Sequence, residues 1–67
     1  MHITLFIENE NKRTRVALQS STIIDALDEL HINPVTIVAS LNGTIVPETA
    51  YLHEGDTLEL FSVVSGG

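Results

Sequence analysis

Cysteine is absent from this chain of 67 residues. Its absence excludes a disulfide framework, a thiol nucleophile and a thiolate site for a metal ion. The chain also lacks an apolar run long enough to cross a membrane, and its start is not a charged segment followed by an apolar block. We therefore expect neither membrane association nor secretion, and the cytoplasm is the expected location.

Basic residues are scarce. Lys12, Arg13 and Arg15 are the only three, against nine acidic residues, and the formal net charge is −6. An acidic domain repels phosphate backbones, which argues against nucleic-acid binding. Complementary charge accelerates encounter, so the expected partner is a protein with a basic docking surface. Solubility alone would explain the same acidity, and the charge does not separate these two interpretations.

The size allows one small domain, which buries only about 60% of its unfolded surface. The hydrophobic fraction of 43% suits a compact core. The sequence ends in Ser65-Gly66-Gly67, and two glycines add nothing to a core and lose the most entropy on ordering. We therefore expect a folded domain over residues 1–64 and a flexible tail over residues 65–67. Taken alone, the dipeptide is better explained as a frayed end or an expression scar.

Two alternating segments open the chain and predict a β-hairpin. In the first, Leu5 and its alternate neighbours point inward and Phe6 points outward, as in a half-buried strand. In the second, Val16 and Leu18 point inward. The polar stretch between them contains Lys12, which we expect to be exposed in the turn.

A helix is predicted to follow. Thr22 is the expected N-cap and places Asp25 at the third helical position, as in a short-armed capping box. Apolar residues recur at helical spacing and form the inward stripe: Ile23, Leu27 and Leu30. Asn33-Pro34 is expected to stop the helix, because proline disfavours a helical residue before it.

Three strands are predicted in the remainder. Residues 37–41 alternate, and Asn42-Gly43 is typical of a type I′ hairpin turn because both residues tolerate positive φ. A short strand over residues 44–46 then ends at Pro47. In the irregular stretch that follows, Tyr51 and Leu52 are expected beneath the sheet. Gly55-Asp56 is a turn, and the last strand then points inward with Leu58, Leu60 and Val64 and outward with Glu59, Phe61 and Val63.

This order of elements predicts an α+β fold of the β-grasp (ubiquitin-like) type. The expected mixed sheet has four to five strands, with the first and last side by side at its centre and one helix packed on one face. If these parities hold, the face opposite the helix carries an apolar cluster expected to dock a partner: Phe6, Val38, Phe61 and Val63. A shift of register by one residue, or cover by loops, would remove this surface.

The sequence resembles the ThiS and MoaD sulfur carriers, which are ubiquitin-like proteins of thiamine and molybdopterin synthesis. The likeness covers essentially the whole chain. It rests on the order of elements, the run Asn42-Gly43-Thr44-Ile45-Val46-Pro47, the turn Gly55-Asp56 and the ending Gly66-Gly67. ThiS-like chains often carry Arg and Trp where this sequence has Glu48 and Tyr51. Small archaeal and eukaryotic ubiquitin-like modifiers share the same outline.

The resemblance implies a carrier and not an enzyme, with no cofactor bound to the chain itself. An E1-like adenylating enzyme (ThiF/MoeB-like) would use Mg-ATP to form an acyl-adenylate on Gly67. A sulfur donor would then convert it to a thiocarboxylate, for a downstream synthase in thiamine thiazole synthesis or a related sulfur transfer. The sequence does not separate thiamine from molybdopterin synthesis, tRNA thiolation or protein conjugation.

Two alternatives remain open. In the first, the protein is a modifier joined through Gly67 to lysines of protein targets, with Lys12 as a site of self-conjugation. In the second, it is a β-grasp binding module without chemistry at its tail.

Other polar residues favour structural roles. The three histidines, His2, His31 and His53, match no ligand spacing, so we expect no metal site. The acidic residues Asp25, Asp28 and Glu29 oppose the apolar stripe of the helix, which favours a solvated face over a catalytic carboxylate set.

Overall fold

The computed structural model describes residues 1–62. Its elements follow the predicted order, with these bounds: β1 (His2–Ile7), η1 (Glu8–Glu10), β2 (Lys12–Ala17), α1 (Ile23–Glu29), η2 (Pro34–Thr36), β3 (Ile37–Leu41), β4 (Thr44–Val46) and β5 (Thr57–Ser62). The predictions for Val63, Val64, Gly66 and Gly67, and the boundary between domain and tail, lie outside the described residues.

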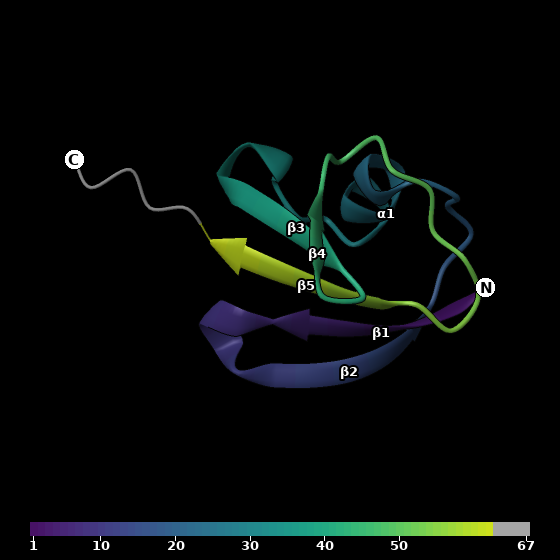
Figure 1. Ribbon diagram of the computed structural model, residues 1–67, viewed down its shortest axis with the longest axis horizontal. Coiled ribbons are helices and arrows are strands. Elements are labelled where there is room, and N and C mark those ends of the chain that lie inside the picture. The colour runs from purple at the N-terminus through teal and green to yellow at the C-terminus, as the bar shows by residue number, and fades with distance from the viewer. Residues whose placement is uncertain (63–67) are drawn as a thin grey trace.

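The five strands form one mixed sheet in the order β2-β1-β5-β3-β4 (Figure 1). The central strands β1 and β5 are parallel, and their register pairs Leu5 with Leu58. The other neighbours are antiparallel. The predicted β-grasp fold, with the first and last strands side by side, is confirmed.

The core lies between α1 and one face of the sheet. It is built from alternate residues of the strands and the inward stripe of the helix, and its largest fully buried side chains are Ile3, Ile23, Leu27, Leu58 and Leu60. Burial of each such side chain contributes about 1.5–3 kcal/mol, and this sets the register, because a slip by one residue would expose the whole set.

The start of α1 is fixed by partners for its first N–H groups, which have none within a helix. The Ile23 N–H donates to the Ala50 carbonyl (3.0 Å) and the Ile24 N–H to the Glu48 carbonyl (2.7 Å). The Asp25 N–H donates to the Thr22 hydroxyl (3.4 Å). The predicted N-cap Thr22 is confirmed. The irregular stretch after β4 therefore serves to hold the helix start against the sheet.

The end of α1 corrects the sequence prediction, because the helix stops before Asn33-Pro34. The N–H of Ile32 donates to the Leu27 carbonyl (2.8 Å) and the N–H of His31 to the Asp28 carbonyl (3.1 Å). With His31 at φ 61°, this is a Schellman motif. Asn33 instead caps the short turn η2, accepting from the Val35 N–H at 3.0 Å.

The prediction for Tyr51 is wrong. Leu52 is buried as expected, but the Tyr51 side chain is 68% exposed. The backbone of this stretch is bound to the segment before α1, since Leu52 N–H donates to the Ser21 carbonyl (2.8 Å) and Tyr51 forms a bridge with Thr22. Adjacent residues of an extended segment point to opposite sides, so only one of the two faces the core.

Candidate functional site

The sheet face opposite α1 gathers apolar side chains. Val38 and Phe61 are direct partners across β3 and β5, and Phe6 stands opposite Glu59 on the same face. All three apolar side chains are half-buried. The predicted parity of these strands is therefore right for Phe6, Val38 and Phe61, while Val63 lies outside the described residues.

The structure adds Ile45 to this face, a residue that the sequence interpretation did not select. Ile45 is the partner of Ser40 in the β3–β4 hairpin and is 63% exposed. The signal was present in the sequence. A two-residue turn at Asn42-Gly43 pairs the flanking strands residue by residue, so Ile45 shares the outward face of Ser40. We call Phe6, Val38, Ile45 and Phe61 together the outer patch.

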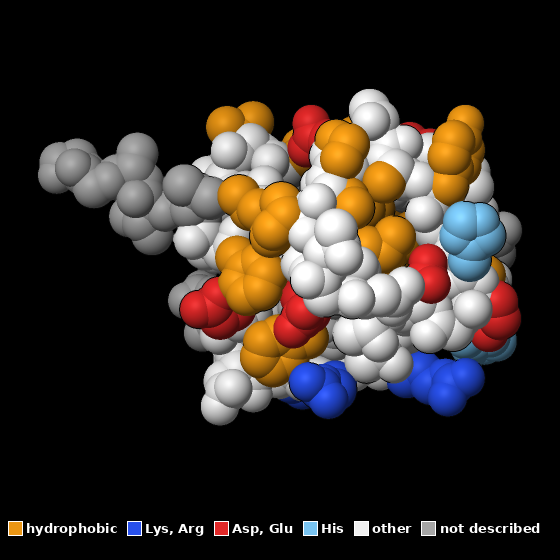
Figure 2. All heavy atoms as spheres, in the orientation of Figure 1, with side chains coloured by type: hydrophobic (Ala, Val, Ile, Leu, Met, Phe, Trp, Pro, Cys, Tyr) orange, Lys and Arg blue, Asp and Glu red, His pale blue; other side chains and the backbone are white. Residues whose placement is uncertain are grey.

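Charged groups border the outer patch. Figure 2 shows hydrophobic side chains gathered over the ends of β1 and β5, with acidic side chains among them and basic ones along the lower edge of the view. The Arg13 guanidinium carbon lies 5.5 Å from the centre of the Phe6 ring, within range of a cation–π interaction. On β5, Glu59 pairs with Phe6 of β1 on one side and with Ser40 of β3 on the other.

The outer patch adjoins the route to the last residues of the chain. Phe61 is the penultimate residue of β5, which ends at Ser62, and the chain continues from there to residues 63–67. A partner bound to this patch would thus also be close to Ser62, the last described residue before the segment that contains Gly66 and Gly67.

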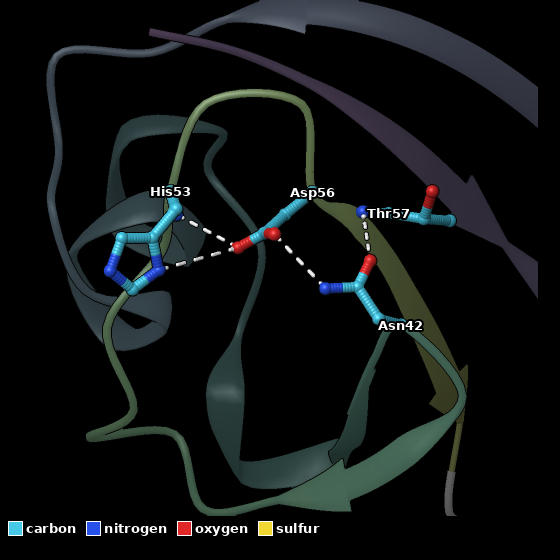
Figure 3. Close-up of polar contacts among 4 residues, drawn as sticks. All are labelled: Asn42, His53, Asp56 and Thr57. Carbon is cyan, nitrogen blue, oxygen red and sulfur yellow. Dashed lines mark hydrogen bonds and ion pairs between the residues drawn. The ribbon is translucent and has the colours of Figure 1, made fainter.

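The two turns that contributed to the family resemblance are bound to each other (Figure 3). Asp56 accepts hydrogen bonds from the Asn42 amide (3.0 Å) and the His53 N–H (2.8 Å), and Asn42 accepts from the Thr57 N–H (2.9 Å). Asn42 and Gly43 have φ of 52° and 90°, as a type I′ turn requires. These motif residues therefore have a structural role: they hold the β3–β4 hairpin beside the start of β5.

Two of the histidines lie near different carboxylates. The Nδ1 atom of His2 lies 3.8 Å from Oε2 of Glu54, and the Nδ1 atom of His53 lies 3.8 Å from Oδ2 of Asp56. Within residues 1–62 there is no group of three or more residues of metal-ligand type. In the same range, no helix is long and apolar enough to cross a membrane.

Glu29 has a structural partner that explains an acidic residue near the C-terminus of a helix. Its carboxylate accepts from the Ser20 hydroxyl (2.6 Å), the Gln19 N–H (3.1 Å) and the Ser20 N–H (3.1 Å). The hydroxyl bond, followed by the bond from Gln19, lowers the pKa of Glu29 below its ordinary value. Asp25 and Asp28 are exposed on the same helix.

Lys12 is exposed, as predicted, but it is the first residue of β2 and not part of the turn. Its partner across the hairpin is Ile7. The turn itself is the short η1 helix followed by Asn11, which has φ 49°.

Comparison with known proteins agrees with this architecture. The chain matches the ThiS family over residues 4–67. It is similar to SAMP1 from Haloferax volcanii, with a TM-score of 0.71, 25% identity and coverage of 100% of both chains. It is also similar to a chain of the protein–protein complex of subunits 1 and 2 of the molybdopterin-converting factor from Helicobacter pylori 26695, with a TM-score of 0.70, 14% identity and coverage of 100% of both chains. The latter likeness shows the fold alone. No curated protein matches the chain.

Proposed function

The chain belongs to the ThiS family, whose members are non-catalytic sulfur carriers, and we propose that Gly67 is the residue that carries the sulfur. The observation that supports this most directly is the family match, which extends through Gly66 and Gly67. The thiazole of thiamine, or a product of related sulfur transfer, is the proposed destination of the sulfur.

The chemistry starts from a carboxylate that is ionised at neutral pH, since an α-carboxyl group has a pKa of about 3.3–3.7. One carboxylate oxygen of Gly67 attacks the α-phosphate of ATP, pyrophosphate leaves, and an acyl-adenylate forms. A hydrosulfide ion delivered by the sulfur donor then attacks the carbonyl carbon. AMP leaves with that carboxylate oxygen, and a thiocarboxylate remains. An E1-like enzyme with Mg-ATP supplies the positioning and charge stabilisation for these steps.

The outer patch is the proposed docking surface for that enzyme. Exposed apolar clusters on small proteins mark partner sites, and aromatic residues such as Phe6 and Phe61 are enriched in interfaces. Residues 63–67 follow β5, and five residues span at most about 18 Å when fully extended. This length would let Gly67 reach a narrow active site while the sheet remains docked outside.

A second function is favoured by the similarity to SAMP1, which supports a relationship to small archaeal modifiers. In this alternative, Gly67 forms isopeptide bonds with lysines of protein targets. The activation step is the same, and only the nucleophile that displaces AMP differs. Lys12 is the only lysine of the chain and is exposed, so it would be the lysine through which chains grow.

The intact mass of the protein isolated from its native host, without acid or reducing agent, tests the carrier function. We expect a population in which one oxygen is replaced by sulfur, and we expect fragmentation to place the change on Gly67. The same spectrum measures whether Gly67 is the terminal residue of the mature protein, as the proposal requires. Absence of the sulfur-containing form in cells with an active sulfur donor would contradict the proposal.

A search for conjugates separates the carrier from the modifier. A tagged chain is expressed in its host with desulfuration and isopeptidases blocked, and digests are searched for remnants of Gly66-Gly67 on lysines. A pure carrier leaves none. For a modifier, Lys12→Arg should eliminate lysine-linked chains and spare single conjugates, because arginine keeps the charge and is not acylated under these conditions. Remnants on target lysines would therefore favour the modifier.

A further inference from the structure

The basic residues of this chain are gathered on one strand. All three basic residues lie on β2, an edge strand, whereas Glu59 is the only acidic residue within the five strands. Arg13 and Arg15 share the face of the outer patch, because their partners across the hairpin are Phe6 and Thr4. The other acidic residues lie on α1, on η1 and in loops. The strands thus present two arginines and one glutamate on the outer face of a chain whose net charge is −6.

Both arginines are available to a partner. Their side chains are exposed, and among the strands of residues 1–62 β2 has no neighbour on its free side. Within residues 1–62 the ion pairs involve only histidines, so neither Arg13 nor Arg15 forms a salt bridge with a carboxylate of this part of the chain. The stacking of Arg13 on Phe6 at 5.5 Å holds its charge at the border of the outer patch. A stacked guanidinium still presents its N–H groups to a carboxylate.

The local charge governs docking more than the net charge does. Charges separated by more than about 8 Å are largely screened at physiological ionic strength. The acidic residues of α1 lie on the opposite side of the sheet from the outer patch. A partner approaching this patch therefore meets Arg13, Arg15 and Glu59 at close range, and the helix acids only through solvent and salt. Glu8 and Glu10 lie on η1, which follows directly on β1.

We infer that the docking surface of the activating enzyme carries carboxylates that face Arg13 and Arg15 beside an apolar centre. This inference rests on the proposed function. It reverses, for this face, the expectation of a basic partner drawn from the net charge. The arginines steer the encounter and fix the orientation of the sheet on the enzyme, while the outer patch supplies the apolar contact.

The test measures the association rate constant between the chain and the E1-like adenylating enzyme encoded in the same genome, over a series of salt concentrations. The variant Arg13→Glu/Arg15→Glu should associate about 10-fold more slowly at low salt, and the difference should shrink as salt is added. The matched control is Lys12→Glu, which changes a charge on the same strand but on the other face. It should associate at nearly the wild-type rate. Circular dichroism melts verify that each variant is folded.

The outcomes separate the inference from the function on which it rests. Faster association of the arginine variant would show that a basic enzyme surface meets this face, and equal rates would show that the arginines face no charge; either result overturns the inference alone. Failure of the wild-type chain to support ATP–pyrophosphate exchange would overturn the proposed function and the inference with it. Sedimentation of the chain alone is expected to give a monomer. A dimer that the arginine variant dissociates would assign this surface to a second copy and overturn the inference.

Discussion

Deletion of Gly67 is expected to abolish ATP-dependent activation of this chain while leaving its fold intact. The described core ends at β5, and none of its buried residues lies beyond Leu60. The deletion moves the terminal carboxylate back by one residue, away from the α-phosphate that it must attack. The measurement is pyrophosphate exchange catalysed by the cognate E1-like enzyme, with thermal unfolding of each protein recorded alongside.

Two further variants define how the tail acts. Gly66→Leu should slow exchange by about 10²-fold, since misplacement of a reacting group by about 1 Å has an effect of that size. Ser65→Ala is the matched control, because it changes a neighbouring tail residue and adds no bulk. Equal exchange by the wild type and the Gly67 deletion would contradict activation at this residue.

The order of the strands along the chain was predictable because each strand carries its own signal. Alternation placed Leu58 and Leu60 inward and Phe61 outward, and Asn42-Gly43 specified a two-residue turn. These are local patterns, and burial of one sheet face leaves a single register compatible with them. The central parallel pair of β1 and β5 then followed from placing one helix on one face.

The errors came from features that depend on contacts distant in sequence. Tyr51 was misplaced because the stretch around it has no regular period, and its orientation follows from the bridge to Thr22. The helix ends early because His31 adopts a left-handed conformation. Glycine, and not histidine, is the usual residue with this conformation at the end of a helix. Glu29 is exposed, as expected, and the structure adds its bonds from the Ser20 hydroxyl and the Gln19 N–H, which the sequence pattern does not indicate.

The candidate site was predictable only in part. The parity of single strands identified Phe6, Val38 and Phe61, but membership of Ile45 required the pairing of β4 to be worked out from the turn. The net charge predicts a basic partner, and composition contains no information on which face a charge occupies. The placement of Arg13 opposite Phe6 and of Arg15 opposite Thr4 depends on the hairpin register, which the structure establishes.

Replacement of Phe61 by aspartate should weaken binding to the activating enzyme by at least about 1–2 kcal/mol, the scale of an interface hot spot. The change places a carboxylate within the outer patch, where docking would remove it from water without a partner. The free energy of unfolding should fall by no more than about 1 kcal/mol, because Phe61 packs on this face as a cross-strand partner of Val38 and not in the core. Titration calorimetry and thermal melts measure the two quantities.

Val35→Asp is the matched control for this prediction. Val35 is 86% exposed on η2, outside the outer patch, so the same introduced charge should leave binding unchanged. Ile45→Asp, on the patch and 63% exposed, should weaken binding with little loss of stability. This pair separates a charge at the docking surface from a charge elsewhere on the protein. Unchanged binding by both Phe61→Asp and Ile45→Asp would remove the outer patch from the interface, because a buried aspartate at either position has no means of remaining hydrated.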